Sequence, residues 1–185
     1  MKRISILLTL VLLSVAGHAA VDIQKSGDFP SSIKHLAIAP LPCSAEVNCK
    51  KVEKRLNKVV QKHFPQAQIV DTAGIKQALF DMSVVEPNKE AVIEAARKLG
   101  CDAVLLPAVL GSERTDHWNV WTEYDSGKVH SSDAASVTSS VRIIIMDLEG
   151  KLLMKGEATG ESYLQTDPTY FAESQFDKIL RKALD

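Results

Sequence analysis

Residues 88–111, NKEAVIEAARKLGCDAVLLPAVLG, hold the pattern that decides the fold. Asn88 is a favoured helix N-cap, and apolar residues follow it at helical spacing until Gly100, which suits the left-handed position after a helix. Residues 103–110 are then nearly all apolar, which indicates a strand whose two faces are both covered. The stretch therefore predicts a helix and an interior strand, with a bulge or an unpaired position at Pro107 because proline has no N–H to donate.

Similar patterns extend in both directions from this unit. On the N-terminal side they predict a strand at 34–40, a helix at 45–64, a short strand at 66–70 and a helix capped by Asp71. On the C-terminal side they predict strands at 136–146 and 151–162 and a last helix starting at Asp167 and Pro168. The order β-α-β-α-α-β-β-β-α predicts one α/β domain over residues 34–185, with a mixed sheet of about five strands under packed helices.

The first residues differ from the rest of this 185-residue chain. Lys2 and Arg3 precede an apolar run at 4–15, and small residues follow it. This order is typical of a secretory signal peptide over residues 1–19, cleaved after Ala19, and the run is too short for a final membrane anchor. Losing two positive charges moves the formal charge from −1 to −3, which favours no general binding to nucleic acid. We expect a soluble periplasmic protein in which residues 20–33 form a flexible lead.

The cysteines agree with export. Cys43 and Cys49 bracket five residues, and such a pair in an exported protein is most simply a disulfide. A redox pair or a metal site is the alternative, but the spacing is not that of a CxxC motif and no histidine is close in sequence. Cys101 begins the interior strand, where a buried free thiol is expected. We predict no metal site and no cofactor.

The helix expected at 45–64 has a strongly basic face. Its members are Lys50, Lys51, Lys54, Arg55, Lys58 and Lys62. Such a face could dock peripherally on an anionic membrane surface or on an acidic protein. We favour a solvated surface, because runs of charge usually serve only that role.

Residues 113–135 contain Trp118, Trp121 and Tyr124 in a chain that is only 5% aromatic. Residues 125–128 resemble a hairpin turn, and pairing across that turn would place Val109 opposite Ile144 and Leu105 opposite Leu148. The segment therefore predicts a β-ribbon that projects beyond the sheet. Its aromatic side chains could bind a partner protein, or they could fold back over the sheet as a minor core, and the pattern leaves both open.

Catalytic signatures are absent from the sequence. It contains no nucleophile elbow, zinc-protease motif, phosphate-binding loop or dinucleotide fingerprint. His117 and His130 share the aromatic segment, but the expected register does not place them opposite each other. These observations favour a protein that is not an enzyme.

The stretch AARKLGCDAVLLPAVLG, followed by a strand, the turn of Asp147 to Gly150 and a returning strand, resembles a group of bacterial envelope proteins. The group includes the curli secretion lipoprotein, the amino-terminal domain of the TolB translocation protein and the lipoprotein activator of peptidoglycan synthases. The resemblance implies a non-enzymatic interaction module with a mixed sheet. This chain departs from many of these proteins because it has no cysteine near the cleavage point for a lipid anchor.

Together these patterns predict a periplasmic protein-interaction or assembly-support module that binds an envelope protein partner. A small-molecule-binding or hydrolytic enzyme with an unrecognised pocket is one alternative. Peripheral docking on an anionic membrane surface through the basic helix is the other. Convergent ionisable side chains in a cleft would favour the enzyme, and an exposed aromatic ribbon would favour the interaction module.

Overall fold

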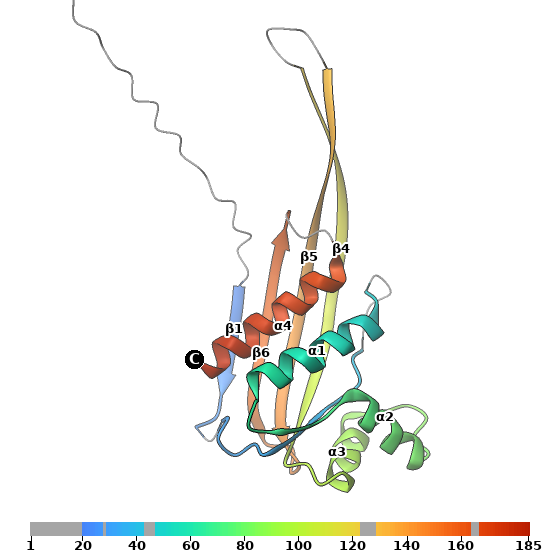
Figure 1. Ribbon diagram of the computed structural model, residues 1–185, viewed down its shortest axis with the longest axis vertical. Coiled ribbons are helices and arrows are strands. Elements are labelled where there is room, and N and C mark those ends of the chain that lie inside the picture. Colours follow the sequence, from blue (N-terminus) through green and yellow to red (C-terminus); the bar gives the residue numbers. More distant parts are fainter. Residues whose placement is uncertain (1–19, 28, 43–46, 123–128, 164–166) are drawn as a thin grey trace, which may run out of the picture.

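The computed structural model describes residues 20–27, 29–42, 47–122, 129–163 and 167–185, and it describes only the backbone of 117–122 and 129–134. The described strands form one mixed sheet in the order β1-β6-β5-β4-β2-β3 (Figure 1). Its antiparallel part contains β1 (Ala20–Lys25), β6 (Leu152–Ser162), β5 (Val129–Asp147) and β4 (Ala103–Thr122). Its parallel part adds β2 (His35–Ile38) and β3 (Gln68–Val70) beside β4.

Within the described residues, four helices cover the two faces of this sheet unequally. α1 (Cys49–His63) and α4 (Pro168–Leu184) lie side by side across one face (Figure 1). α2 (Thr72–Asp81) and α3 (Lys89–Lys98) form a pair on the other face, beside β2, β3 and β4. The predicted α/β class with a mixed sheet is confirmed, and one strand is added at the beginning of the order.

Local signals explain where the helices begin. Asp71, Asn88 and Asp167 accept backbone hydrogen bonds as N-caps, at 2.9, 2.8 and 2.8 Å, as the sequence predicts. α1 begins later than expected, because the side chain of Asn48 accepts from the Lys51 N–H at 3.1 Å and acts as the cap. The predicted glycine positions are confirmed too, since Gly100 and Gly150 have φ values of 71° and 84°.

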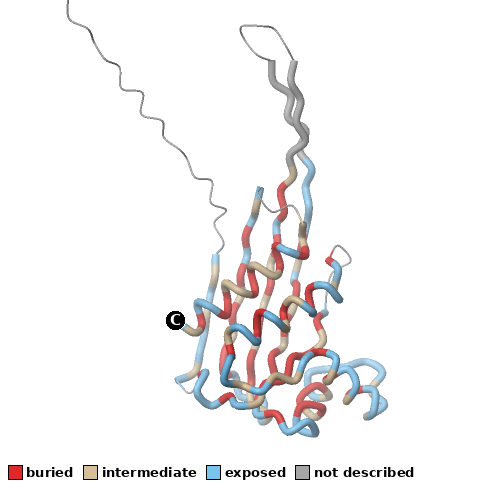
Figure 2. Tube along the Cα trace, viewed as in Figure 1, coloured by how far each residue is buried: buried red, intermediate tan, exposed pale blue. Residues whose placement is uncertain are grey.

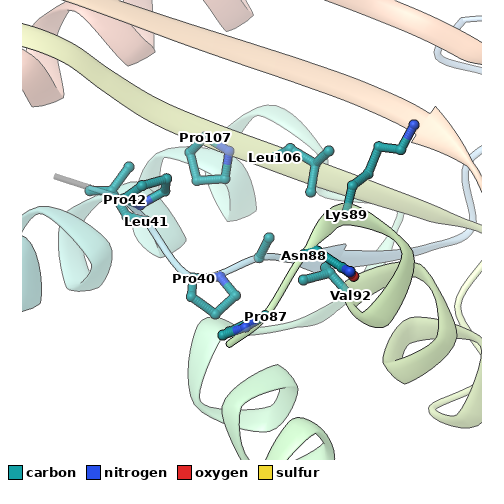
Figure 3. A pocket seen from close by; sticks show the side chains of 10 residues that line it. Pro40, Leu41, Pro42, Pro87, Asn88, Lys89, Val92, Leu106 and Pro107 are labelled. Atoms are coloured by element: carbon teal, nitrogen blue, oxygen red, sulfur yellow. The ribbon is translucent and has the colours of Figure 1, made fainter. Parts of the chain in front are cut away.

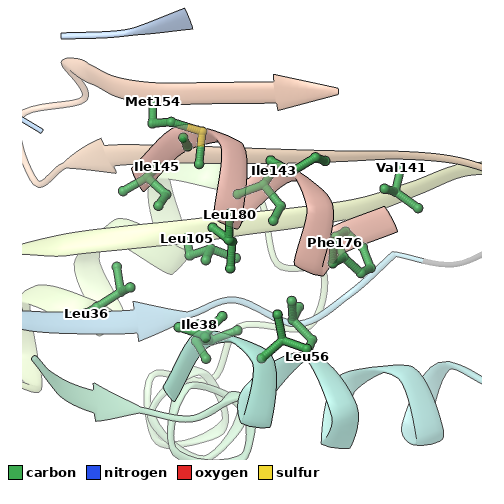
Figure 4. Close-up of a cluster of buried hydrophobic side chains, with 14 of the residues drawn as sticks. Leu36, Ile38, Leu56, Leu105, Val141, Ile143, Ile145, Met154, Phe176 and Leu180 are labelled. Carbon is green, nitrogen blue, oxygen red and sulfur yellow. The ribbon is translucent and has the colours of Figure 1, made fainter. Parts of the chain in front are cut away.

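The main core lies between the sheet and the α1–α4 pair (Figures 2 and 4). Its largest fully buried apolar side chains come from three strands of the sheet's middle, from β6 and from both helices: Leu36, Ile38, Leu56, Leu105, Ile143, Ile145, Met154, Phe176, Ile179 and Leu180. A smaller core lies between the opposite face and the α2–α3 pair. Cys101 is buried there as a free thiol, as predicted, and burial raises its pKa. The interior strand is therefore buried on both faces where helices lie over it.

The expectation of a flexible lead over residues 20–33 is wrong. Residues 20–25 are strand β1, which pairs antiparallel with β6 from Ala20 opposite Thr159 to Lys25 opposite Met154. Val21 and Ile23 alternate with polar residues and pack against the main core, which explains why the segment is ordered. Phe29 is also buried, with its ring edge against Phe64 at 6.1 Å between centroids.

The expectation of a bulge at Pro107 is wrong, and the alternative, an unpaired position, holds only on the side of β2. Pro107 pairs with Ile143, and the register shift lies between Val109 and Gly111. The carbonyl of Leu105 and the N–H of Val109 both bond toward the segment that follows β2, so the intervening proline nitrogen faces that side too. Because β2 has ended there, the strand pairing needs no donor from Pro107.

The predicted register of the ribbon is wrong as well. Val109 lies opposite Val141 and Leu105 opposite Ile145, each three residues from the expected partner. The last described pair is Thr122 with Val129, and the assumed turn at 125–128 lies outside the described residues. The bulge after Val109 accounts for one of the three residues. The prediction omitted this bulge, and one residue of slip changes which face every side chain occupies.

Candidate functional site

The ribbon formed by β4 and β5 is the most prominent feature outside the body of the protein (Figure 1). β6 pairs with β5 only as far as Val137, opposite Ser162. Beyond that pair, residues 115–122 and 129–136 pair only with each other in the described part of the sheet. At the usual rise of a strand this ribbon extends roughly 25 Å. The predicted projection near 113–135 is therefore present in the backbone.

The structure places the predicted partner-binding residues only in part. Trp118 lies opposite Asp133 and Trp121 opposite His130 in the backbone pairing. Their side chains, and Tyr124 altogether, lie outside the described residues, so their role in binding stays a prediction. His117 lies opposite Ala134, so the two histidines of the segment are not cross-strand partners.

Buried polar side chains without hydrogen-bond partners occur near the base of the ribbon and on α4. Ser112 and Ser139 face each other across β4 and β5, and both are buried with no hydrogen-bond partner among the described atoms. Gln175 on α4 is fully buried, and neither polar atom of its amide is paired in the described part. Each such group left unpaired costs about 1–3 kcal/mol, so this part of the core is less stable than its burial suggests.

The basic face of α1 meets an acidic face of α4. Three of the six predicted residues pair there: Lys51 with Asp167 at 3.6 Å, Arg55 with Glu173, and Lys62 with Asp177 at 2.9 Å. Arg55 also stacks on the ring of Tyr170, 3.6 Å from its centroid. The other three, Lys50, Lys54 and Lys58, are exposed on α1. These ion pairs neutralise three of the six positive charges that the sequence predicts for docking on an anionic surface.

These contacts lower the pKa values of two carboxylates of the α4 segment, Asp167 and Asp177. Burial alone would raise the pKa of Asp177, but hydrogen bonds from Lys62 and His63 leave it below its usual value. Burial likewise opposes the shift at Asp167, whose pKa is lowered by the Thr169 N–H and the charge of Lys51. At neutral pH both groups are therefore ionised and hold α4 against α1.

A cavity of about 370 Å³ opens where β2 ends (Figure 3). Four prolines contribute to its walls, namely Pro40, Pro42, Pro87 and Pro107, together with Ala39, Leu41, Val92 and Leu106. Among the described residues that line it, Lys89 alone is charged, and the Asn88 side chain is already bound to the N–H of Ala91. We call this cavity the proline pocket. Its described lining is mostly apolar and suits an apolar group.

Two further cavities contain charged residues that are already engaged. One of about 500 Å³ lies between α1 and α4, where Lys62, Glu173 and Asp177 form the ion pairs described above. Another of about 270 Å³ includes Asp102 and Asp147, which accept backbone hydrogen bonds at the start of β2 and in the turn before β6. Among the described residues no cluster of His, Cys, Asp and Glu could hold a metal ion.

The predicted disulfide stays a prediction, because Cys43 lies outside the described residues while Cys49 begins α1.

Glu53 is a buried residue whose role was not predicted from the sequence. Its carboxylate binds the Leu41 N–H at 3.0 Å and the Lys76 ammonium at 2.8 Å, which joins α1, α2 and the segment after β2. A single acidic residue on the apolar side of a basic helix was the available signal.

No family model matches this sequence, and no curated protein matches it. Solved structures share its fold at low identity. A single-substitution variant of PelC from Paraburkholderia phytofirmans, a dodecamer, aligns with a TM-score of 0.56 and 15% identity over 90% of this chain and 99% of that chain. A second PelC dodecamer structure from the same organism aligns with a TM-score of 0.51 and 13% identity, over 88% and 95%.

Lipoprotein GNA1162 from Neisseria meningitidis aligns with a TM-score of 0.50 and 10% identity, over 80% of this chain and 96% of that chain. At these identities the likeness shows a shared fold. The three envelope families that the sequence resembles are not shown by these comparisons. No helix within the described ranges combines the length and the apolar character needed to cross a membrane.

Proposed function

We propose that this protein is a protein-interaction or assembly-support module of the bacterial envelope, and that its β4–β5 ribbon is the contact element. The module acts in the periplasm and catalyses no reaction of its own. The observation that carries the proposal is the ribbon backbone, in which residues 115–122 and 129–136 pair beyond the end of the sheet.

Energetics favour a binding role for the ribbon. A two-stranded ribbon is marginally stable in water and buries little apolar area of its own. Its outer edges present backbone donors and acceptors that an added strand from a partner can satisfy. A partner that packs on the ribbon would therefore gain contacts that the body does not use.

The fold comparisons support an assembly role in the envelope. PelC, which shares the fold, is a dodecamer in both structures, and GNA1162 is a lipoprotein. The signal-peptide pattern at residues 1–19, which lies outside the described residues, supports export. The apolar proline pocket and the paired charges of the α1–α4 cavity support a protein without catalytic activity.

Site-specific photocrosslinking in living cells tests this proposal. A photoreactive amino acid is placed at Trp118, Trp121 or Tyr124, and at the exposed Gln61 on α1 as a control. We expect one defined crosslinked product from the ribbon positions and none from position 61. Equal capture from all four positions, or none from the ribbon, would contradict the proposal.

A shortened ribbon provides the matched variant. Asp116 and Ala135 are paired, so Asn-Gly can replace residues 117–134 as a two-residue turn. The described residues of the removed segment pair only with each other in the sheet, so we expect the free energy of unfolding to change by less than about 1 kcal/mol. We expect the shortened protein, crosslinked from position 115, to lose the partner.

A further inference from the structure

The connection between α2 and α3 presents an apolar side chain to solvent. Val85 is 93% exposed, and Phe80 at the end of α2 is 76% exposed. Figure 2 shows most of this connection as exposed. The proline pocket begins two residues beyond Val85, at Pro87. The exposed Val85, which we call the knob, therefore lies two residues from the pocket wall, in the α2–α3 part of the body and far from the ribbon in Figure 1.

The knob is held in place by the backbone on both sides. Ser83 adopts a left-handed φ of 58°, and the N–H of Val84 bonds to the Leu79 carbonyl at 3.0 Å. This 6→1 hydrogen bond ends α2 as a Schellman motif. Asn88 caps α3 only three residues beyond Val85. Because both ends are fixed, the exposure of Val85 is a built feature of the fold.

The pocket is also preformed. Pro40 and Pro87 come from different segments and lie close together at its base, with Pro107 across from them (Figure 3). Proline rings have little rotamer freedom, so they lose little entropy when the pocket is filled. Preorganised walls and a fixed knob both lower the free-energy cost of association.

Charges flank the two parts in complementary order. Glu86 follows Val85 directly, and Lys89 lines the pocket. Lys89 is half exposed and only 3.7 Å from its neighbour Glu90, which is a weak contact. The cation at the pocket is therefore available to an incoming carboxylate.

We propose that a second copy of this chain covers the patch. Two copies related by a twofold axis each insert Val85 into the proline pocket of the other, and Glu86 of each copy meets Lys89 of its mate. An isologous contact requires one surface to carry both complementary parts, and this surface does. The proposal concerns the body of the protein and does not depend on the ribbon.

Sedimentation equilibrium over a range of protein concentrations tests the contact. We expect the wild-type chain to form dimers, and Val85→Asp to raise the dimer dissociation constant at least about tenfold because a charge enters an apolar pocket. Leu99→Asp is the matched control, since Leu99 is 42% exposed at the other end of α3. We expect this control to leave the dissociation constant unchanged.

A charge swap separates the contact from folding effects. Glu86→Lys and Lys89→Glu change exposed side chains, and a glutamate in the first turn of α3 favours that helix. We expect each substitution alone to weaken the dimer by about threefold or more, and the double variant to restore it. Loss of the dimer in both single variants without restoration in the double variant would overturn the proposal.

Other results also decide the question. A wild-type chain that stays monomeric up to its solubility limit overturns the proposal, as does any oligomer that Val85→Asp leaves intact. A larger ring held by this contact would be a head-to-tail assembly, and it would overturn the twofold arrangement. The ribbon-shortened variant should keep the dimer, so a failure of this inference is distinguishable from a failure of the proposed function.

Discussion

The sheet face beneath α1 and α4 is apolar across β2, β4, β5 and β6, whereas the opposite face is apolar only beside α2 and α3. On that opposite face β5 and β6 carry polar partners, including Arg142 with Glu157 at 3.7 Å and Ser140 with Thr159 at 3.1 Å. Lys155 joins Glu157 at 3.1 Å in the same row. The side chains of the sheet are thus apolar where a helix packs on them and mostly polar where none does.

The difference between the two faces indicates which part of the protein contributes most to the free energy of unfolding. The α1–α4 face should account for most of it, because nearly all of the largest buried side chains lie there. The opposite face, with its polar row and its exposed knob, is available for contacts. The predictions below challenge this division, from the largest expected effect to the smallest.

Two phenylalanines give the sharpest contrast. Phe176 on α4 is fully buried, and Phe80 on α2 is 76% exposed. We expect Phe176→Ala to lower the free energy of unfolding by about 3–5 kcal/mol, because it leaves a large cavity. Phe80→Ala should change it by less than about 0.5 kcal/mol. Urea denaturation of both variants measures this, and similar losses would refute the division between the faces.

Glycine positions provide the second contrast. A Cβ at position 156 would lie 2.3 Å from Cγ2 of Ile179 and 2.9 Å from Cδ1 of Ile23, so α4 packs directly on the backbone of β6. Gly156→Ala should lower the free energy of unfolding by about 1–3 kcal/mol through overpacking. Gly111→Ala, where nothing lies within 4 Å, should be nearly neutral by the same urea assay. Equal tolerance at both positions would mean that α4 moves away from the sheet at little cost.

Gln175 is a weak point within the buried face. Replacing it with Met keeps a similar volume and removes two buried polar atoms that lack partners in the described part. We expect Gln175→Met to raise the free energy of unfolding by about 1 kcal/mol, measured by thermal and urea unfolding. The exposed Gln77 on α2 serves as the control for the same substitution. A loss of stability specific to position 175 would show that its amide is well satisfied.

The ion pairs between α1 and α4, which we call the α1–α4 seam, should give the smallest change in the free energy of unfolding, and this change should depend on pH. The pKa of Asp177 is lowered in the folded state, so its stabilisation is present above the unfolded value of about 3.9 and is lost as pH falls through the lower folded pKa. Asp177→Asn should lower stability by up to about 1 kcal/mol at pH 7, because the pair is partly exposed.

The difference between Asp177→Asn and wild type should shrink as the pH falls below about 4, as the lowered folded pKa requires. Unfolding curves measured from pH 7 to pH 3 test this. Asp22→Asn, on the polar side of β1, is the control and should show no such loss at pH 7. A difference that stays constant with pH would mean that the charge of Asp177 does not stabilise the seam.

Much of the fold could be predicted because its signals are local. The N-caps at Asp71, Asn88 and Asp167 each act within three residues, and the left-handed glycines act at single positions. Strand β1 was missed, although Val21 and Ile23 alternate with polar residues. A strand of six residues at a sheet edge gains its stability from a neighbour, here β6, that is distant in the sequence.

The candidate sites, too, could be predicted from the sequence only where their signals are local. The ribbon could be predicted, because two strands joined by a short connection are adjacent in sequence. Its register could not, because the last described pair, Thr122 with Val129, already differs by two residues from the expected pairing, and the bulge after Val109 adds one more. The pairing of Arg55 with Glu173 joins residues more than a hundred positions apart, and no pattern in either helix reveals it.

The sequence by itself determined the helices, the interior strand, the projecting hairpin and the signal-peptide pattern, since each depends on residues within a few turns or pairs of one another. Only the tertiary structure decided that half of the basic face of α1 is neutralised by α4. It alone brought Pro40, Pro87 and Pro107 around one cavity beside an exposed Val85. These features depend on how separate elements pack, and packing is set by the whole chain.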